Sequence, residues 1–222
     1  DYLNKALETA KKTPSLATHE NLVKIYKCRG KAWLNQDERT KAISDFNLML
    51  QNATRAKNES MIADSHYWLG GAYEPYFGET EQSVRHLTTA VQMARKIGDK
   101  PLEAKSLSSI GEALVWGLDT IDEGRKKVEE SSKICKEIGD KITDSHNFQV
   151  LGIYYNQKGE FDKAKENFTK ALALAETVGS IPLTKYKLWF LSYALAGNGE
   201  YNEAIRTGQK CLQIARDYGD WS

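Results

Sequence analysis

The sequence has few residues that cross-link a chain or break a helix. Its 222 residues include four prolines and three cysteines, and Cys28, Cys135 and Cys211 do not have the spacing of a metal site. Such a small, odd number of cysteines argues against a disulfide framework and suits a reducing cytosol. Apolar runs fall short of the roughly 18 residues that a membrane span requires. We therefore expect a cytoplasmic chain that does not insert into a membrane.

An excess of charge of either sign is also absent. Lysine and arginine total 31 and aspartate and glutamate total 30, so the formal net charge is +1. A chain this close to neutral has no global field to attract nucleic acid or an anionic membrane. Apolar residues make up 41% of the chain and charged residues 27%, a balance that allows an ordinary globular core.

Helical periodicity runs through the chain, and it repeats. No long segment alternates apolar and polar residues with period two. Four similar phrases end segments, with glycines 41, 40 and 40 residues apart: Ile97-Gly98-Asp99, Ile138-Gly139-Asp140, Val178-Gly179-Ser180 and Tyr218-Gly219-Asp220. A glycine directly after a helix can adopt the left-handed conformation that closes its last turn. Each phrase therefore predicts the end of a helix.

Two further rows of residues keep the same period. Small residues stand at Gly30, Gly70, Gly111, Gly152 and Ser192, each followed three positions later by a large one, at Trp33, Tyr73, Leu114, Tyr155 and Leu195. A second row, Ala42, Ser83, Gly124, Ala164 and Ala204, is followed four positions later by Phe46, Leu87, Val128, Phe168 and Gly208. A small residue lets a neighbouring helix approach closely, and a large one fills the space beside it. The rows predict repeated pairs of packed helices.

The copy Phe148-x-x-Leu151-Gly152-x-x-Tyr155, followed by Ala164, Phe168 and Ala171, resembles the tetratricopeptide signature. The resemblance implies an all-α fold, a right-handed α-solenoid of about five antiparallel helix pairs. Helix A of each pair would line a concave groove, and helix B would face outward. The period is about 40 rather than 34 residues, and Gly-Asp replaces the closing proline. This longer form is similar to arrays in the maltose-regulon activator, in other signalling ATPases and in Partner-of-Inscuteable scaffolds.

We expect one array over residues 1–222, with repeats at 21–58, 59–99, 100–140, 141–180 and 181–220. The predicted helix pairs are Leu22–Gln36 with Glu38–Ala56, Met61–Tyr73 with Thr80–Ile97, Pro101–Trp116 with Ile121–Ile138, Thr143–Gln157 with Phe161–Val178, and Pro182–Ala196 with Tyr201–Tyr218. Residues 1–13 copy part of a helix B, because Leu3–Ala10 matches Phe168–Ala175. We therefore expect the chain to be part of a longer array in a multidomain protein.

The sequence contains no convincing enzyme motif. Asp-Ser-His occurs twice, ending at His66 and at His146, and these are the residue types of a hydrolase triad. Adjacent helical residues point about 100° apart, however, and cannot relay a proton to one another. In the repeat alignment His66 falls on the buried stripe, and Cys211 falls in a row of small core residues. We expect no enzyme activity, no cofactor and no metal site.

The resemblance implies that the groove is lined by helix A residues outside the Leu-Gly-x-x-Tyr stripe. The positions that match are Lys24, Lys27, Lys31, Tyr67, Lys105, His146, Gln149, Tyr186, Trp189 and Tyr193. The three lysines of the first repeat have i, i+3, i+7 spacing and form one cationic strip, either a solvated helix face or a site for an acidic ligand. The three aromatic residues of the last repeat have the same spacing. They would pack against a missing repeat or anchor a partner peptide.

These observations predict a scaffold that binds another protein or peptide in its groove, within a protein whose other domains contact the array. Weak self-association through uncovered ends is also expected. The alternative is an effector-sensing or self-association arm of a signalling ATPase or transcription regulator.

Overall fold

The computed structural model describes residues 2–13, 18–73, 78–117 and 120–218, and these ranges contain eleven α-helices and no strand. The helices are α1 (Tyr2–Lys12), α2 (His19–Leu34), α3 (Arg39–Arg55), α4 (Glu59–Ala72), α5 (Thr80–Ile97), α6 (Lys100–Trp116), α7 (Ile121–Ile138), α8 (Lys141–Gln157), α9 (Phe161–Val178), α10 (Ile181–Gly197) and α11 (Tyr201–Tyr218). None of the described helices is long and apolar enough to cross a membrane.

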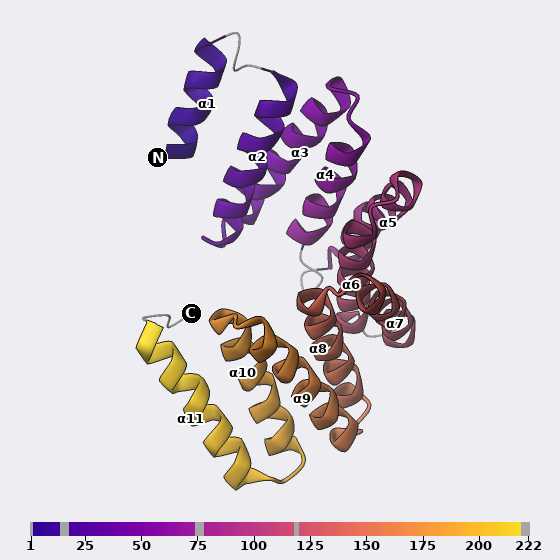
Figure 1. Ribbon diagram of the computed structural model, residues 1–222, viewed down its shortest axis with the longest axis vertical. Helices are drawn as coiled ribbons and strands as arrows, with labels where there is room; N and C mark the ends of the chain where they lie inside the picture. Colours follow the sequence, from indigo (N-terminus) through magenta and orange to yellow (C-terminus); the bar gives the residue numbers. More distant parts are fainter. Residues whose placement is uncertain (1, 14–17, 74–77, 118–119, 219–222) are drawn as a thin grey trace.

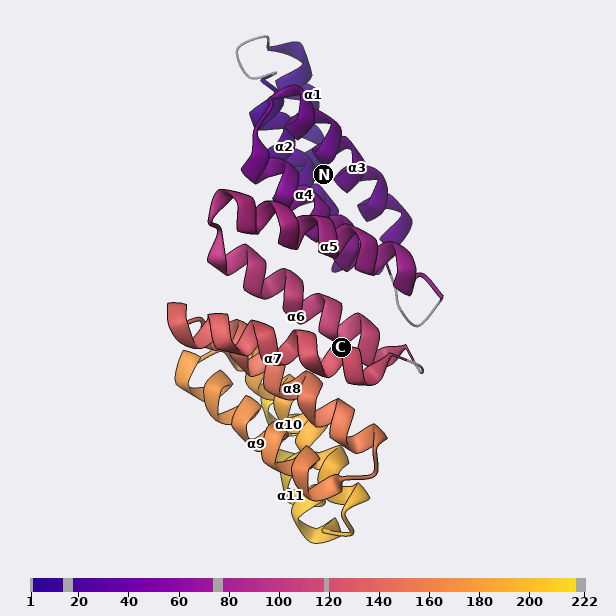
Figure 2. The same cartoon turned by 90° about the vertical axis from the view of Figure 1, so that its right-hand side faces the viewer.

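The helices form a right-handed superhelix of antiparallel pairs, as the sequence predicts. Each even-numbered helix from α2 to α10, which we call an A helix, packs against the B helix that follows it. Figure 1 shows the pairs following one another around a curve, with the A helices α2, α4, α8 and α10 toward its inside. In Figure 2 the same pairs succeed one another from one end of the molecule to the other. The A helices therefore form the concave wall.

The predicted bounds of four B helices coincide with the observed ones, whereas the A helices begin one to three residues earlier than predicted. Capping residues account for the earlier starts of α2, α4, α6 and α8. Thr18, Asn58, Asp99 and Asp140 each accept a hydrogen bond from a backbone N–H in the first turn of the A helix that follows. This satisfies a donor that has no partner within the helix, so the helix extends back to the capping residue.

Gly98, Gly139 and Gly179 close α5, α7 and α9 in the left-handed conformation, with φ of 76°, 73° and 70°. Gly219, the fourth glycine of this set, lies outside the described residues. The first repeat has no such glycine, yet its chain turns in the same way. Lys57 adopts φ of 54° after α3, although a left-handed backbone is costly for a residue with a Cβ. The turn is thus dictated by the packing of the repeats.

A glycine in the A helix provides the close helix crossing that the small-residue row predicts. A Cβ atom added to Gly152 would lie 2.6 Å from Phe168 Cε1, and one added to Gly70 would lie 2.5 Å from Leu87 Cγ. Phe46, Leu87, Val128 and Phe168 are almost completely buried. The fifth pair differs, because Ser192 replaces the glycine of α10 and Gly208 replaces the large residue of α11. A Cβ added to Gly208 would meet no atom within 4 Å.

We predict that Gly152→Leu lowers the free energy of unfolding by ~2–3 kcal/mol, because the new side chain must displace Phe168 or separate two helices. The matched control is Gly208→Leu, which adds the same atoms where there is open space. Urea denaturation followed by circular dichroism measures both. A Gly152→Leu variant as stable as the parent would contradict the crossing geometry.

The histidine of the first Asp-Ser-His phrase lies against a second histidine. His66 of α4 is half-buried, and its Nδ1 lies 3.0 Å from Nδ1 of His86 on α5. Tyr73 stacks on the His86 ring with 5.7 Å between the ring centroids. Burial lowers the pKa of His66, and burial followed by the neighbouring charge of His66 lowers that of His86 to about 4. This contact links helix A to helix B.

The histidine pair predicts a loss of stability in mild acid. Because the folded state holds the pKa of both rings below the unfolded value, unfolding takes up protons as the pH falls from about 6.5 toward 4. We expect the free energy of unfolding to fall by ~1–2 kcal/mol over this window, since the pair is partly screened by solvent. Replacing His86 by Phe, which preserves the stacking on Tyr73, should flatten the profile. An unchanged pH profile would show that the pair does not control it.

Candidate functional site in the concave groove

The concave wall contains two adjoining hollows. The polar hollow, of about 570 Å³, lies among the ends of α2, α4 and α6 and is lined by Lys27, Lys31, Asp64, Asp99 and Lys105 among others. The apolar hollow, of about 440 Å³, extends from α2 to α10 and includes Leu34, Trp68, Ile142 and Leu183. Tyr67, Trp68 and Lys105 line both hollows. Together the hollows form one groove across the A helices.

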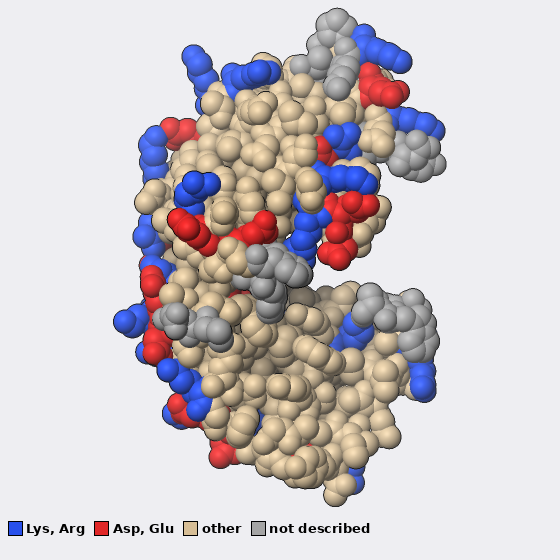
Figure 3. Space-filling view, turned by 180° about the vertical axis from the view of Figure 1, so that it is seen from behind, with Lys and Arg blue, Asp and Glu red and all other residues tan. Residues whose placement is uncertain are grey.

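The two halves of the molecule differ in charge along this groove. Figure 3 shows its mouth between the N-terminal half and the C-terminal half. Lysine, arginine, aspartate and glutamate side chains gather on the N-terminal side of the mouth, whereas the surface on the C-terminal side is mostly uncharged. A ligand that spans the groove therefore meets a charged wall at one end and an uncharged wall at the other.

Polar contacts join each A helix to the next along the groove floor. Lys27 of α2 donates to Asp64 of α4 over 2.7 Å, and the hydroxyls of Tyr67 and Ser109 join α4 to α6. Glu112 of α6 contacts His146 of α8 over 3.2 Å, and Lys187 and Tyr186 of α10 both contact Gln149 of α8. These contacts hold neighbouring A helices together and give the charged side chains of the floor partners within the protein.

The charges of the floor are balanced within it. Burial alone would raise the pKa of Glu112, but attraction to His146 and a hydrogen bond from it outweigh this effect, so the pKa lies below the usual value. Burial lowers the pKa of Lys187 to about 8, against the opposing attraction of Glu112. Burial raises the pKa of Tyr67, which keeps its hydroxyl neutral. At neutral pH the floor thus holds an anion, a buried cation and a neutral phenol.

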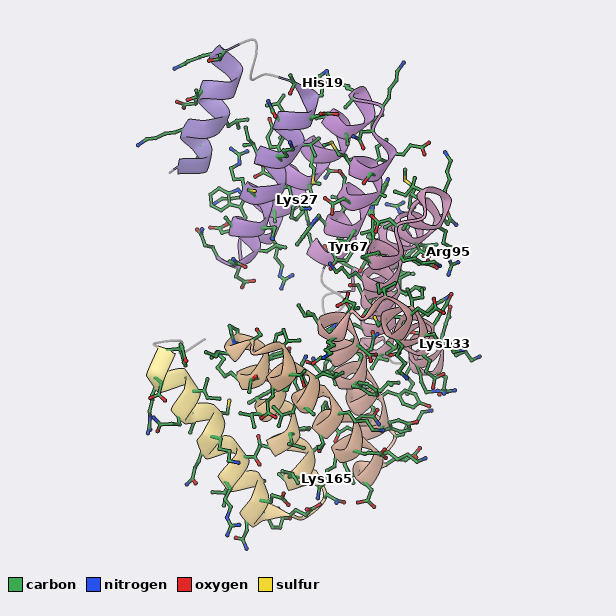
Figure 4. All side chains as sticks on the ribbon, viewed as in Figure 1. His19, Lys27, Tyr67, Arg95, Lys133 and Lys165 are labelled. Carbon is green, nitrogen blue, oxygen red and sulfur yellow. The ribbon has the colours of Figure 1, made fainter. Side chains whose placement is uncertain are left out.

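The predicted groove residues fall into three groups by exposure. Lys24, Lys31 and Lys105 are exposed, as are the three aromatic residues of α10, while Lys27, Tyr67 and His146 are half-buried in the floor contacts. Figure 4 shows Lys27 and Tyr67 on the inner side of α2 and α4, and Arg95 and Lys133 on the outer side. Gln149 corrects the prediction. It is 0% exposed, because the next A helix covers it with Lys187, and it cannot contact a partner in this conformation.

The aromatic row of α10 is open to solvent. Tyr186, Trp189 and Tyr193 are 47%, 54% and 60% exposed. Tyr186 stacks on Trp189 with 6.4 Å between the ring centroids, and Trp189 meets the buried ring of Phe190 edge-on at 4.7 Å. The underlying core therefore supports the exposed rings, which are large and rigid enough to act as anchors.

Sequence reasoning missed residues that lie between the lysines of α2 and the aromatic row of α10. Trp68 of α4 stacks on Phe46, donates its indole N–H to Asp64 and lies beneath the Lys31 ammonium at 5.0 Å. Ile142 and Leu183 belong to the first turns of α8 and α10, where the sequence places Ile142 just outside its helix and Leu183 at the edge of its own. The Asp140 cap extends α8 back to include Ile142.

The cysteines are free thiols in different places. Cys28 is exposed, Cys135 is buried and Cys211 is half-buried, with its Sγ 3.3 Å from the Lys185 carbonyl oxygen. Burial raises the pKa of Cys135 to about 11, so it is a neutral thiol at pH 7. Across the described ranges, no group of three or more histidine, cysteine, aspartate or glutamate side chains is arranged to hold a metal ion.

The buried lysine gives a prediction about stability. The pKa of Lys187 is about 8 in the folded chain and about 10.5 in the unfolded one, so stability is lost as the pH falls from about 10.5 to about 8. Replacing the pair by apolar residues, as Lys187→Met with Gln149→Leu, should raise the free energy of unfolding at pH 7 by ~1–3 kcal/mol. Denaturant titrations at pH 7 and pH 10 measure this. A double variant less stable than the parent at pH 7 would contradict the assignment.

Comparison with known sequences supports the repeat over a limited region. Residues 146–177, which lie in α8 and α9, match the sequence profile of the tetratricopeptide repeat. No curated protein sequence matches the chain.

Solved structures extend the likeness to the whole chain. A Rap protein complexed with the competence and sporulation factor superposes with a TM-score of 0.85 at 15% identity, over 98% of this chain and 59% of that one. The Rap conjugation gene regulator of the plasmid pLS20, in complex with the Phr* peptide, gives 0.80 at 20%, over 93% and 56%. TPR-like repeats of a putative kinesin light chain from Podosopora anserina give 0.64 at 16%, over 89% and 96%.

This chain spans 59% and 56% of the length of the two Rap structures. At these levels of identity the likeness concerns the fold. It agrees with the pairing of the helices, with the glycine crossings and with the match over residues 146–177. The chain has the fold of a tetratricopeptide-repeat superhelix.

Proposed function

We propose that the chain is a scaffold that binds a peptide, or an extended or helical segment of another protein, in its concave groove. The observation that carries this proposal is the continuous groove, whose floor is crossed by contacts between A helices and whose hollows are lined by the exposed Lys31 and Lys105, together with the exposed aromatic row on α10. Such a surface exists before the ligand arrives, so binding costs little ordering of the scaffold.

The structural neighbours favour the same kind of ligand. Two of them were solved with a bound factor or peptide, the competence and sporulation factor in one and the Phr* peptide in the other. We extend peptide binding to this chain by analogy of fold. The residues that would bind the peptide are those of its own groove. We infer that it acts by binding, without turnover, inside a cytosolic multidomain protein that also carries domains in contact with the array.

A second candidate function uses the same groove. In this alternative the array senses an effector for a signalling ATPase or transcription regulator, as in the maltose-regulon activator that the sequence resembles. The Rap conjugation gene regulator, solved with a peptide, favours it. The two candidates differ in the outcome of binding, since a sensor must change its contacts with another domain or another copy when the ligand binds.

Affinity capture from the native lysate tests the proposal, comparing the parent with a Trp189→Ala, Tyr193→Ala variant. We expect the variant to bind the captured partner about tenfold more weakly or worse, because exposed aromatic anchors contribute much of the affinity of such grooves. Its melting temperature should change little, since both rings are more than half exposed. Titration of the purified partner, followed by fluorescence anisotropy, measures the loss.

Tyr201→Ala is the matched control, because Tyr201 is an equally exposed aromatic residue on the B helix α11. It should leave the captured proteins unchanged. If the parent and the groove variant capture the same partners with equal affinity, the aromatic row is not the binding surface. A change of oligomeric state on ligand binding, measured by analytical ultracentrifugation, would favour the sensor arm.

A further inference from the structure

Lysine side chains outnumber carboxylates in the lining of the polar hollow. Lys27 is paired with Asp64, whose second oxygen accepts the Trp68 indole N–H. Asp99 is also occupied, because its carboxylate accepts the Leu102 backbone N–H at the start of α6. Asp64 therefore offsets the charge of Lys27, whereas Asp99 keeps its negative charge, and the three lysines that line the hollow outnumber its two carboxylates.

Lys31 and Lys105 complete this hollow and are exposed. Within the described ranges, neither ammonium is paired with a carboxylate, and Lys31 lies over the Trp68 ring. The ring positions the cation without neutralising it, since a cation–π contact leaves the ammonium free to donate hydrogen bonds. Two cations that face the same hollow without anionic partners favour an anionic group of a ligand.

The adjoining hollow has the opposite character. Leu34, Ile142 and Leu183 line it together with the Trp68 ring, and Ile142 is 52% exposed. A large apolar residue at the mouth of a hollow is covered only when a ligand supplies an apolar side chain. Because Tyr67, Trp68 and Lys105 line both hollows, a single short segment of ligand can reach both.

We propose that this groove selects a peptide segment in which an aspartate or glutamate side chain lies two to four residues from a large apolar side chain. The carboxylate is held by Lys31 and Lys105 in the polar hollow, and the apolar side chain fills the space between Trp68, Ile142 and Leu183. In an extended peptide, side chains two residues apart point the same way and lie about 7 Å apart, which suits adjoining hollows. This inference rests on the proposed function and adds the chemistry of the ligand to it.

The test is selection of random heptapeptides, displayed on phage and fused through their C-terminal ends, on the full chain. Fusion removes the free terminal carboxylate, so any acid that is selected is a side chain. We expect enrichment of sequences that place aspartate or glutamate near leucine, isoleucine, methionine or an aromatic residue. An enriched peptide is then synthesised with blocked ends, and its affinity is measured by fluorescence anisotropy.

Four variants separate the roles of the hollows. Lys105→Gln should weaken the acidic peptide about tenfold, the loss expected for one charge-assisted hydrogen bond. Lys133→Gln, an exposed lysine on the outer side of the molecule (Figure 4), should leave affinity within about twofold. Ile142→Ser should lower the affinity for the parent peptide. It should not lower the affinity for a peptide in which glycine replaces the large apolar residue. The Lys31→Glu, Lys105→Glu variant should prefer a peptide in which lysine replaces the acid.

The outcomes distinguish this inference from the proposed function. Peptides that bind the parent but carry no acid, or that bind Lys105→Gln as tightly as the parent, overturn the inference and leave peptide binding standing. Binding that requires a free C-terminal carboxylate overturns it as well. If no peptide is enriched and none binds, both the inference and the peptide-binding function fail. Recovery of binding with the charge-reversed pair supports the assigned contacts.

Discussion

The close approach of helix A to helix B at a single glycine is the constraint on which the rest of the structure depends. At Gly152 and its equivalents there is no space for a Cβ atom, so the large residue of helix B can lie directly on the helix A backbone. This crossing sets the shape of the first four pairs, whereas the fifth has Ser192 and Gly208 at the equivalent positions. Repetition of the helix pair every 40 or 41 residues generates the curvature that gives the array its concave wall.

The concave wall brings consecutive A helices side by side, so their polar side chains need partners where the helices meet. The chain does so with polar contacts between neighbouring A helices, from Lys27 and Asp64 at one end to Gln149 and Lys187 at the other. The exposed side chains on the same helices are cationic on α2 and α6 and aromatic on α10. In the function that we propose, these exposed side chains bind the ligand, while the contacts of the floor stabilise the fold.

Much of the fold could be predicted because it follows from local chemistry. Glycine after a helix fixes where α5, α7 and α9 end, and alternating small and large residues identify which faces meet. Predictions failed where tertiary packing overrides local preference. Lys57 takes a left-handed conformation without being glycine. The early starts of four A helices have a local cause instead, because the capping residue before each helix extends it. The fifth pair departs from the rule at Gly208 and leaves space where the others are filled.

The sequence by itself determined the class of the molecule: all-α, repeated, near neutral in charge, with the exposed lysines and aromatic residues assigned to the groove face. Periodicity carries this information because each repeat places the same positions on the same faces. Only the tertiary structure decided which of these side chains are used internally. Lys27 and His146 are paired, Gln149 is buried, and Lys31 and Lys105 face a hollow that Trp68 shares. These facts depend on contacts between helices about 40 residues apart in the chain, and such contacts cannot be read from any one repeat.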